Sequence, residues 1–182
     1  MGRIDILEDL KIPVKPYLEQ FKRIRRWKKR LDKIRNSNSS EDEIPNQIDF
    51  IFAYFINCYH LRDFLISSKV IQKEILNKFF EENIEMQLCR DICNECKHCL
   101  LERPSIGIKE SNSNKKSARG WAGVCLVREY IPDSLILKDD KLPIKNIRYV
   151  VLANFKKYDV FELADRCFIL WGNFLKQNKF LK

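Results

Sequence analysis

The chain has 182 residues, the size of one domain, and 45% of them are hydrophobic, including twelve Phe and three Trp. A chain of this length builds a core without needing disulfides or metals. The formal net charge of +9 indicates an anionic partner, nucleic acid being the commonest, although a basic surface also serves solubility alone. The N-terminus lacks the apolar segment of a signal peptide, so we expect a cytoplasmic protein.

The first predicted element is an amphipathic helix over residues 17–35, where apolar residues recur at spacings of three and four. Its other face is strongly basic and carries Trp27 among the cations. A run of charge often serves only to keep a helix face solvated, but this combination favours contact with a phosphate backbone. The candidate nucleic-acid-binding residues of this helix are Arg25, Arg26, Lys29 and Arg30.

Three more helices are predicted before Pro104, over 45–67, 70–82 and 85–102. The first of the three is apolar on nearly all sides, which is typical of a helix at the centre of a fold. It also carries several charged and amide side chains. These exclude a membrane span, so we expect no membrane contact.

A small β insertion is predicted next, because short apolar runs alternate with polar tracts. The expected strands cover 105–110, 121–130 and 147–154. The polar tract 111–120 is predicted to be a mobile hairpin loop. Its cations would extend the basic surface of the first helix, and they are Lys115, Lys116 and Arg119.

Asp159 is predicted to N-cap a last amphipathic helix over 160–177. The apolar face of that helix needs a partner, so we expect it to pack back on the preceding helices. The sequence therefore predicts a single domain of the α+β class, mainly α. It is a four- to five-helix bundle with its helical core at 1–104, a small antiparallel β insertion at 105–158 and the closing helix at 159–182.

Two of the predicted helices carry polar stripes that contain both histidines of the chain. The stripes are Asn57/His60/Asp63 and Asp91/Asn94/His98, and Arg90 and Lys97 flank the second. Residues three and four apart lie on one side of a helix. Each buried polar group without a partner costs roughly 1–3 kcal/mol. We therefore expect the two helices to be neighbours, with the stripes facing each other across a cleft and His60 opposite His98.

These stripes have three open interpretations. In the first, the stripes form a buried hydrogen-bond network that fixes how the two helices pack. In the second they form a catalytic site, and in the third they line a pocket for a small molecule. In a catalytic site, histidine is the natural proton carrier at neutral pH, and a neighbouring Asp would orient its ring.

Four cysteines lie close together, at Cys89, Cys93, Cys96 and Cys99. The first three have the spacing of an iron–sulfur motif, and Cys93, Cys96, Cys99 and His98 are the residue types of a zinc site. All of them fall in a helical period, however, and one straight helix cannot bring four ligands together tetrahedrally. We expect small core residues that are reduced and hold no metal.

The segments Asn57-Cys-Tyr-His-Leu-Arg-Asp63 and Cys89-Arg-Asp-Ile-Cys-Asn-Glu-Cys-Lys-His98 resemble small bacterial proteins of the HEPN-like helical type. In those proteins a similar "CYHLRDW" helix precedes a "CxDxxNxxKH" helix, and a closing helix carries a Trp where this chain has Trp171. HEPN proteins are helical bundles, and many are metal-independent ribonucleases of toxin–antitoxin, CRISPR and anti-phage systems. Their hallmark is Arg, four to six residues, then His, usually completed across a dimer. Here seven residues separate Arg90 from His98.

The resemblance implies an RNA-directed protein of a defence or stress system. It would need no cofactor and would form a homodimer. Such a protein is either an endoribonuclease or a relative that binds RNA without cutting it. In a ribonuclease His98 would be the general acid/base, and Arg90 and Lys97 would contact phosphate. Asn94 and Asp91 would orient groups, and His60 and Asp63 would support the site or carry a second proton. The alternative class is a non-catalytic interaction subunit, in which the buried His/Asp/Asn network only locks two helices together.

Overall fold

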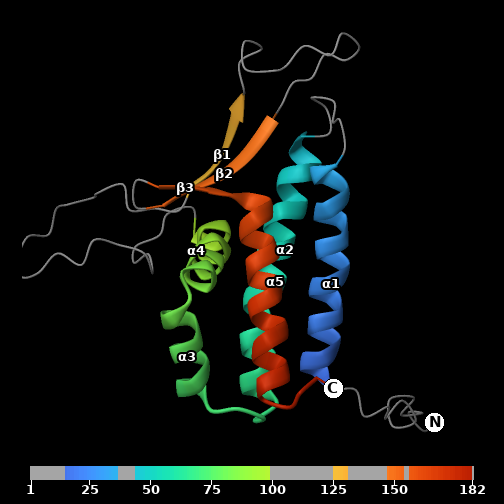
Figure 1. Cartoon of the computed structure of the whole chain (residues 1–182), viewed down its shortest axis with the longest axis vertical. Coiled ribbons are helices and arrows are strands. Elements are labelled where there is room, and N and C mark those ends of the chain that lie inside the picture. Colours follow the sequence, from blue (N-terminus) through green and yellow to red (C-terminus); the bar gives the residue numbers. More distant parts are fainter. Residues whose placement is uncertain (1–14, 37–43, 99–124, 131–146, 154–155, 182) are drawn as a thin grey trace, which may run out of the picture.

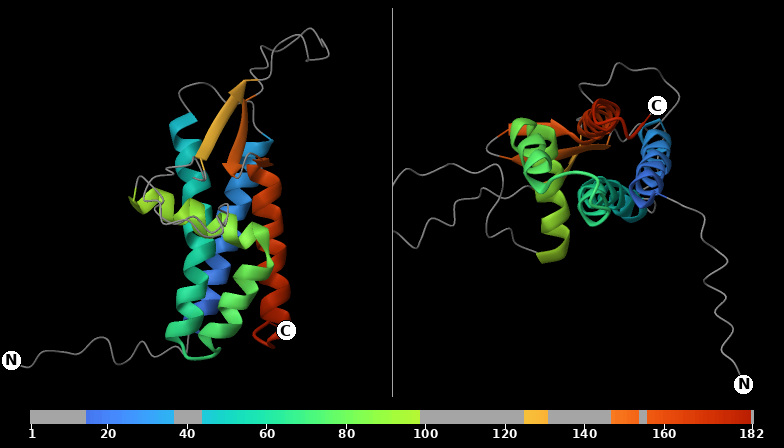
Figure 2. Two further views of the ribbon diagram at one scale, coloured as in Figure 1. Left: turned by 90° about the vertical axis from the view of Figure 1, so that its left-hand side faces the viewer. Right: turned by 90° about the horizontal axis from the view of Figure 1, so that it is seen from below.

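The computed structural model describes residues 15–36, 44–98, 125–130, 147–153 and 156–181. Three long helices run side by side: α1 (Pro16–Arg35), α2 (Ile44–Ser67) and α5 (Val160–Gln177) (Figure 1). Two shorter helices follow α2. Helix α3 (Lys73–Glu82) runs along the bundle, and α4 (Ile84–His98) lies across it (Figure 2). The predicted mainly helical α+β architecture is confirmed.

Helix α2 contacts three other helices, α1, α4 and α5. Its fully buried side chains recur at helical spacings, which places one continuous apolar face against these neighbours. They are Ile51, Tyr54, Phe55, Cys58, Leu61 and Leu65. Trp171 of α5 is also fully buried and packs against Phe79 and Phe80 of α3. Although α2 is long, none of the helices among the described residues is both long and apolar enough to cross a bilayer.

The small sheet sits at one end of the bundle and precedes α5 (Figure 1). Its strands are β1 (Cys125–Tyr130), β2 (Ile147–Ala153) and β3 (Lys156–Asp159), antiparallel in the order β1-β2-β3. The buried hydroxyl of Tyr149 on β2 donates a 2.6 Å hydrogen bond to Oε1 of Gln47 near the start of α2. This bond fixes the sheet to the helical part of the molecule.

The predicted elements differ from the observed ones in two details. The third helix begins at Lys73 rather than at residue 70, because the chain turns after Ser67, with Lys69 at a φ of 52°. The strand β3 was missed, because its sequence KKYD has no apolar alternation to indicate it. The predicted strand at 105–110 and loop at 111–120 lie outside the described residues.

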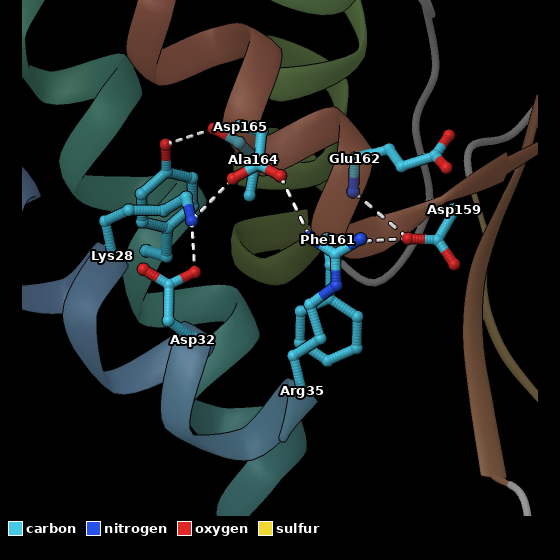
Figure 3. Close-up of polar contacts among 9 residues, drawn as sticks. Lys28, Asp32, Arg35, Asp159, Phe161, Glu162, Ala164 and Asp165 are labelled. Carbon is cyan, nitrogen blue, oxygen red and sulfur yellow. Dashed lines mark hydrogen bonds and ion pairs between the residues drawn. The ribbon is translucent and has the colours of Figure 1, made fainter.

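Asp159 is the N-cap of α5, as predicted. One of its carboxylate oxygens accepts hydrogen bonds from the backbone N–H of Phe161 (2.9 Å) and of Glu162 (3.0 Å) (Figure 3). The same side chain forms a 3.3 Å ion pair with Arg148 of β2. Asp159 therefore satisfies the free N–H groups at the start of α5 and joins the helix to the sheet.

Replacing Asp159 with Ala is expected to lower the free energy of unfolding by about 1 kcal/mol, because two N–H groups of the first turn lose their acceptor. Asp159→Asn is the matched control, since Asn also caps helices but cannot pair with Arg148. Urea unfolding should place Asp159→Asn close to the unmodified protein. If both variants lost the same stability, the ion pair rather than the cap would be the source.

Candidate functional site

The polar stripe of α2 does not face α4 as one unit. The side-chain amide of Gln20, on α1, donates to both the backbone oxygen (2.8 Å) and Oδ1 (3.1 Å) of Asn57. The amide of Asn57 itself donates to the Ala53 carbonyl at 2.7 Å. Asn57 therefore joins α2 to α1, which corrects the expectation that all three residues of the stripe face α4. His60 is half-buried and interacts with its surroundings, whereas Asp63 is exposed and pairs with Arg62 at 3.3 Å.

Helices α2 and α4 are direct neighbours, as predicted. The Cys89 thiol on α4 donates to the Phe55 carbonyl of α2 over 3.5 Å. Asp91 is buried, with 1% of its side chain exposed, and its Oδ1 lies 4.0 Å from Nε of Arg90, which is 33% exposed. Asn94 is half-buried. The backbone of α4 is helical through Lys97 and His98, but their side chains lie outside the described part, so the facing of His60 and His98 stays a prediction.

Two further residues of α2, Tyr59 and Arg62, lie close to this region. Tyr59 is half-buried, and this burial raises the pKa of its hydroxyl, while the nearby positive charges of Arg62 and Arg90 partly oppose the rise. Arg62 also donates a 3.0 Å hydrogen bond to Asn77 of α3. Both residues lie within the Asn57–Asp63 segment that carries the resemblance, but helical spacing alone gave no reason to select them.

The cysteines of α4 that the structure describes are core residues, as predicted. Cys89 and Cys93 are buried free thiols, together with Cys58 of α2 and Cys167 of α5. Burial raises the pKa of Cys89 and of Cys167, which holds both in the neutral form. Cys96 and Cys99 lie outside the described side chains. Among the residues that the structure places, no three His, Cys, Asp or Glu side chains are arranged to hold a metal ion.

Helix α1 carries nine Lys and Arg residues but only two acids, Glu19 and Asp32. Both acids are engaged by cations of the helix itself, Glu19 by Lys22 at 2.6 Å and Asp32 by Lys28. The hydrogen bond from Lys22 holds the pKa of the Glu19 carboxyl below its usual value. Both acids of α1 are therefore paired with cations of the same helix, and its remaining cations have no further acid on α1 itself to pair with.

Six exposed cations of α1 form no ion pair among the described residues. One is Arg23, whose guanidinium donates to the Gln20 side chain, and the other five are called the basic stripe: Arg25, Arg26, Lys29, Arg30 and Lys33. They lie at i, i+1, i+4, i+5 and i+8, so they form one band along the helix. Helix α1 lies at the outer edge of the bundle (Figures 1 and 2), with its apolar face against α2 and α5. The structure thus brings together the four predicted binding residues of this helix and adds Lys33.

Aromatic rings support the basic stripe from beneath. The Arg30 guanidinium lies 4.2 Å from the ring centroid of Trp27, and Phe50 of α2 lies 5.8 Å from the same ring. The Arg25 guanidinium lies 5.8 Å from the ring of Phe21, which is buried and stacks on Phe168 of α5. These cation–π contacts limit the motion of two arginines in the stripe.

Lys28 is the cation of α1 that points inward, and it fixes the helix to α5. Its ammonium, on a side chain only 12% exposed, contacts Asp32 and lies 2.5 Å from Asp165 of α5 (Figure 3). Arg35 reaches the other oxygen of Asp165 at 3.0 Å. Burial lowers the pKa of Lys28, but the hydrogen bonds to Asp165 and Asp32 outweigh burial, and the net pKa is raised.

Comparison of the chain with models of protein families, with curated proteins and with solved structures found no match. The three loop cations that were expected to extend the basic surface, Lys115, Lys116 and Arg119, lie outside the described residues.

Replacing Asp165 with Asn should lower the free energy of unfolding by about 1 kcal/mol at neutral pH, because Lys28 and Arg35 lose their shared carboxylate, which is partly screened by solvent. Since the pKa of Lys28 is raised by folding, its contribution is present at neutral pH and is lost as the pH rises through the folded-state value. Thermal unfolding at neutral and strongly alkaline pH measures both effects.

The matched control for this change is Glu82→Gln, which removes a carboxylate from an exposed pair with Lys78. That change should alter stability by less than about 0.5 kcal/mol. Equal effects of the two substitutions would mean that Lys28 does not hold α1 against α5.

Proposed function

We propose that this protein binds RNA, and that the basic stripe of α1 is its contact surface. The observation that carries the proposal is the segregation of charge on α1. Its two acids are neutralised by neighbouring cations, while five exposed cations in one band have no acidic partner among the described residues. Lys and Arg in such a band release condensed counterions from a phosphate backbone, which supplies affinity without sequence readout.

The way α1 is held also supports the proposal. The helix buries its apolar face, and Lys28 and Arg35 fix it to Asp165 of α5. Two arginines of the stripe rest on aromatic rings. The cations therefore stand on a rigid element, so binding orders fewer side chains and costs less conformational entropy than binding by a flexible basic tail.

Replacing Arg25, Arg26, Lys29 and Arg30 together with Gln is expected to weaken RNA binding by at least about tenfold at low salt and to flatten its salt dependence. Each lost contact to a single strand removes roughly 0.7 from the slope of log affinity against log salt concentration. Fluorescence anisotropy with a labelled RNA at several salt concentrations measures both quantities.

The matched control changes four exposed cations on other elements, Lys73, Lys78, Lys156 and Lys176, to Gln. It lowers the net charge by the same amount but leaves the basic stripe intact. We expect this control to keep most of the affinity and the slope. A similar loss in both variants would assign binding to overall charge and remove α1 as the site.

A second candidate function is metal-independent RNA cleavage at α4, with the 2′-hydroxyl as nucleophile. The observation that favours it is Arg90, a third exposed and beside the buried carboxylate of Asp91, on the helix that also carries His98. In this proposal Arg90 and Lys97 contact the phosphate, His98 transfers the proton, and Asn94 and Asp91 orient groups. His60 and Asp63 support the site, and a homodimer completes it. The alternative, a non-catalytic subunit, is favoured by the burial of Asp91 and by the bond of Asn57 to Gln20.

Replacing His98 with Ala separates these two candidates. If His98 carries the proton, RNA cleavage by EDTA-treated protein should fall by roughly 10²- to 10⁴-fold, while the melting temperature changes little, as for most surface substitutions. If His98 only satisfies a buried network, the melting temperature should drop clearly, because partners lose a hydrogen bond. Unmodified protein that cuts no RNA would remove the ribonuclease proposal and leave RNA binding to be judged on the α1 variants.

A further inference from the structure

The exposed surface of α1 is chemically uniform. From residue 22 to residue 35, every exposed position of the helix is Lys or Arg. The amide side chains that read bases in nucleic-acid complexes are missing from this stretch of the surface. Of the amides at either end of this stretch, Gln20 is buried and bound to Asn57, whereas Asn36 is exposed at the C-cap, about one turn beyond Lys33.

The aromatic rings next to the basic stripe are already covered. Trp27 is half-buried, with the Arg30 guanidinium over it at 4.2 Å and Phe50 packed beside it. Phe21 is 4% exposed and is stacked on Phe168, with 5.5 Å between ring centroids. Stacking of unpaired bases needs an open aromatic face. Trp27 and Phe21 do not offer one, and the neighbouring ring of Phe50, which is 37% exposed, belongs to α2 and lies beside Trp27 rather than in the stripe.

The arginines that lie on these rings are also restricted as base readers. A guanidinium reads guanine by approaching the edge of the base with two parallel N–H donors. Arg30 and Arg25 instead lie over Trp27 and Phe21. In that position their outer N–H groups remain available to phosphate oxygens, which accept hydrogen bonds from many directions.

We infer that α1 recognises the phosphodiester backbone of RNA alone, so that a ribose–phosphate chain without bases is a sufficient ligand. The inference rests on the proposed function, because it specifies what part of RNA the basic stripe contacts. From Arg25 to Lys33 the helix rises by about 12 Å, at roughly 1.5 Å per residue. That length is enough for contact with several successive phosphates of one strand.

The test compares a labelled oligoribonucleotide with an abasic ribose–phosphate oligomer of equal length and charge, by anisotropy with the full-length chain. We expect equal affinities within about threefold and equal salt slopes, because both depend on phosphate contacts alone. If bases were stacked, the abasic oligomer would bind at least about fivefold more weakly for each stacked base lost. That result would overturn the inference while RNA binding itself stood. If neither oligomer bound, the proposed function would fail.

Two variants keep the outcome specific to α1. Replacing all five residues of the basic stripe with Gln should weaken both oligomers equally, and undiminished binding would overturn the inference. Trp27→Leu keeps an apolar side chain under Arg30 but removes the ring. It should leave the ratio of the two affinities unchanged, whereas a selective loss of RNA over the abasic oligomer would show that Trp27 stacks on bases. Circular dichroism checks that both variants remain folded.

Discussion

The near-buried ammonium of Lys28 is the interaction on which the orientation of α1 depends. A cation that is taken out of water needs compensating charge, and here it comes from Asp32 one turn along and from Asp165 across the interface. Because Asp165 also accepts from Arg35, two points on α1 are held to one carboxylate of α5. The rotation of α1 about its axis is then fixed, and Arg25, Arg26, Lys29, Arg30 and Lys33 are left on the outer face.

The polar groups of the inner helices serve a related purpose. Gln20 and Asn57 bond to each other where α1 meets α2, and Tyr149 bonds to Gln47 where the sheet meets α2. In a mainly apolar interface each such pair favours one register over its neighbours, because a shifted helix would leave buried donors unpaired. Asn57, which belongs to a polar stripe whose role the sequence left open, is therefore used for packing.

The helical periods, the basic face of α1 and the cap at Asp159 could be predicted because each is a local property of the chain. Apolar spacing fixes which side of a helix is buried, and an Asp before an apolar run is a recognised helix start. The partners could not be predicted in the same way. Whether Asn57 turns to α1 or to α4 depends on how three helices cross. Lys28 falls at the helical spacing of the apolar face, between Ile24 and Leu31, but its partner Asp165 could not be named from the sequence. Strand β3 depends on pairing with β2, which its own residues do not indicate.

The two candidate sites lie on different sides of the molecule. Helix α1 forms one edge of the bundle and α4 the other, with α2 and α5 between them (Figures 1 and 2). The contacts of an RNA bound on α1 would therefore be the same in the ground state and in the transition state of a reaction at α4. Such uniform binding lowers KM and leaves kcat unchanged. A ribonuclease with this arrangement would show changes in KM when α1 is altered and changes in kcat when α4 is altered. A binding protein needs only α1, and in it the buried Asp91 and the interacting His60 serve to pack α4 against the rest of the fold.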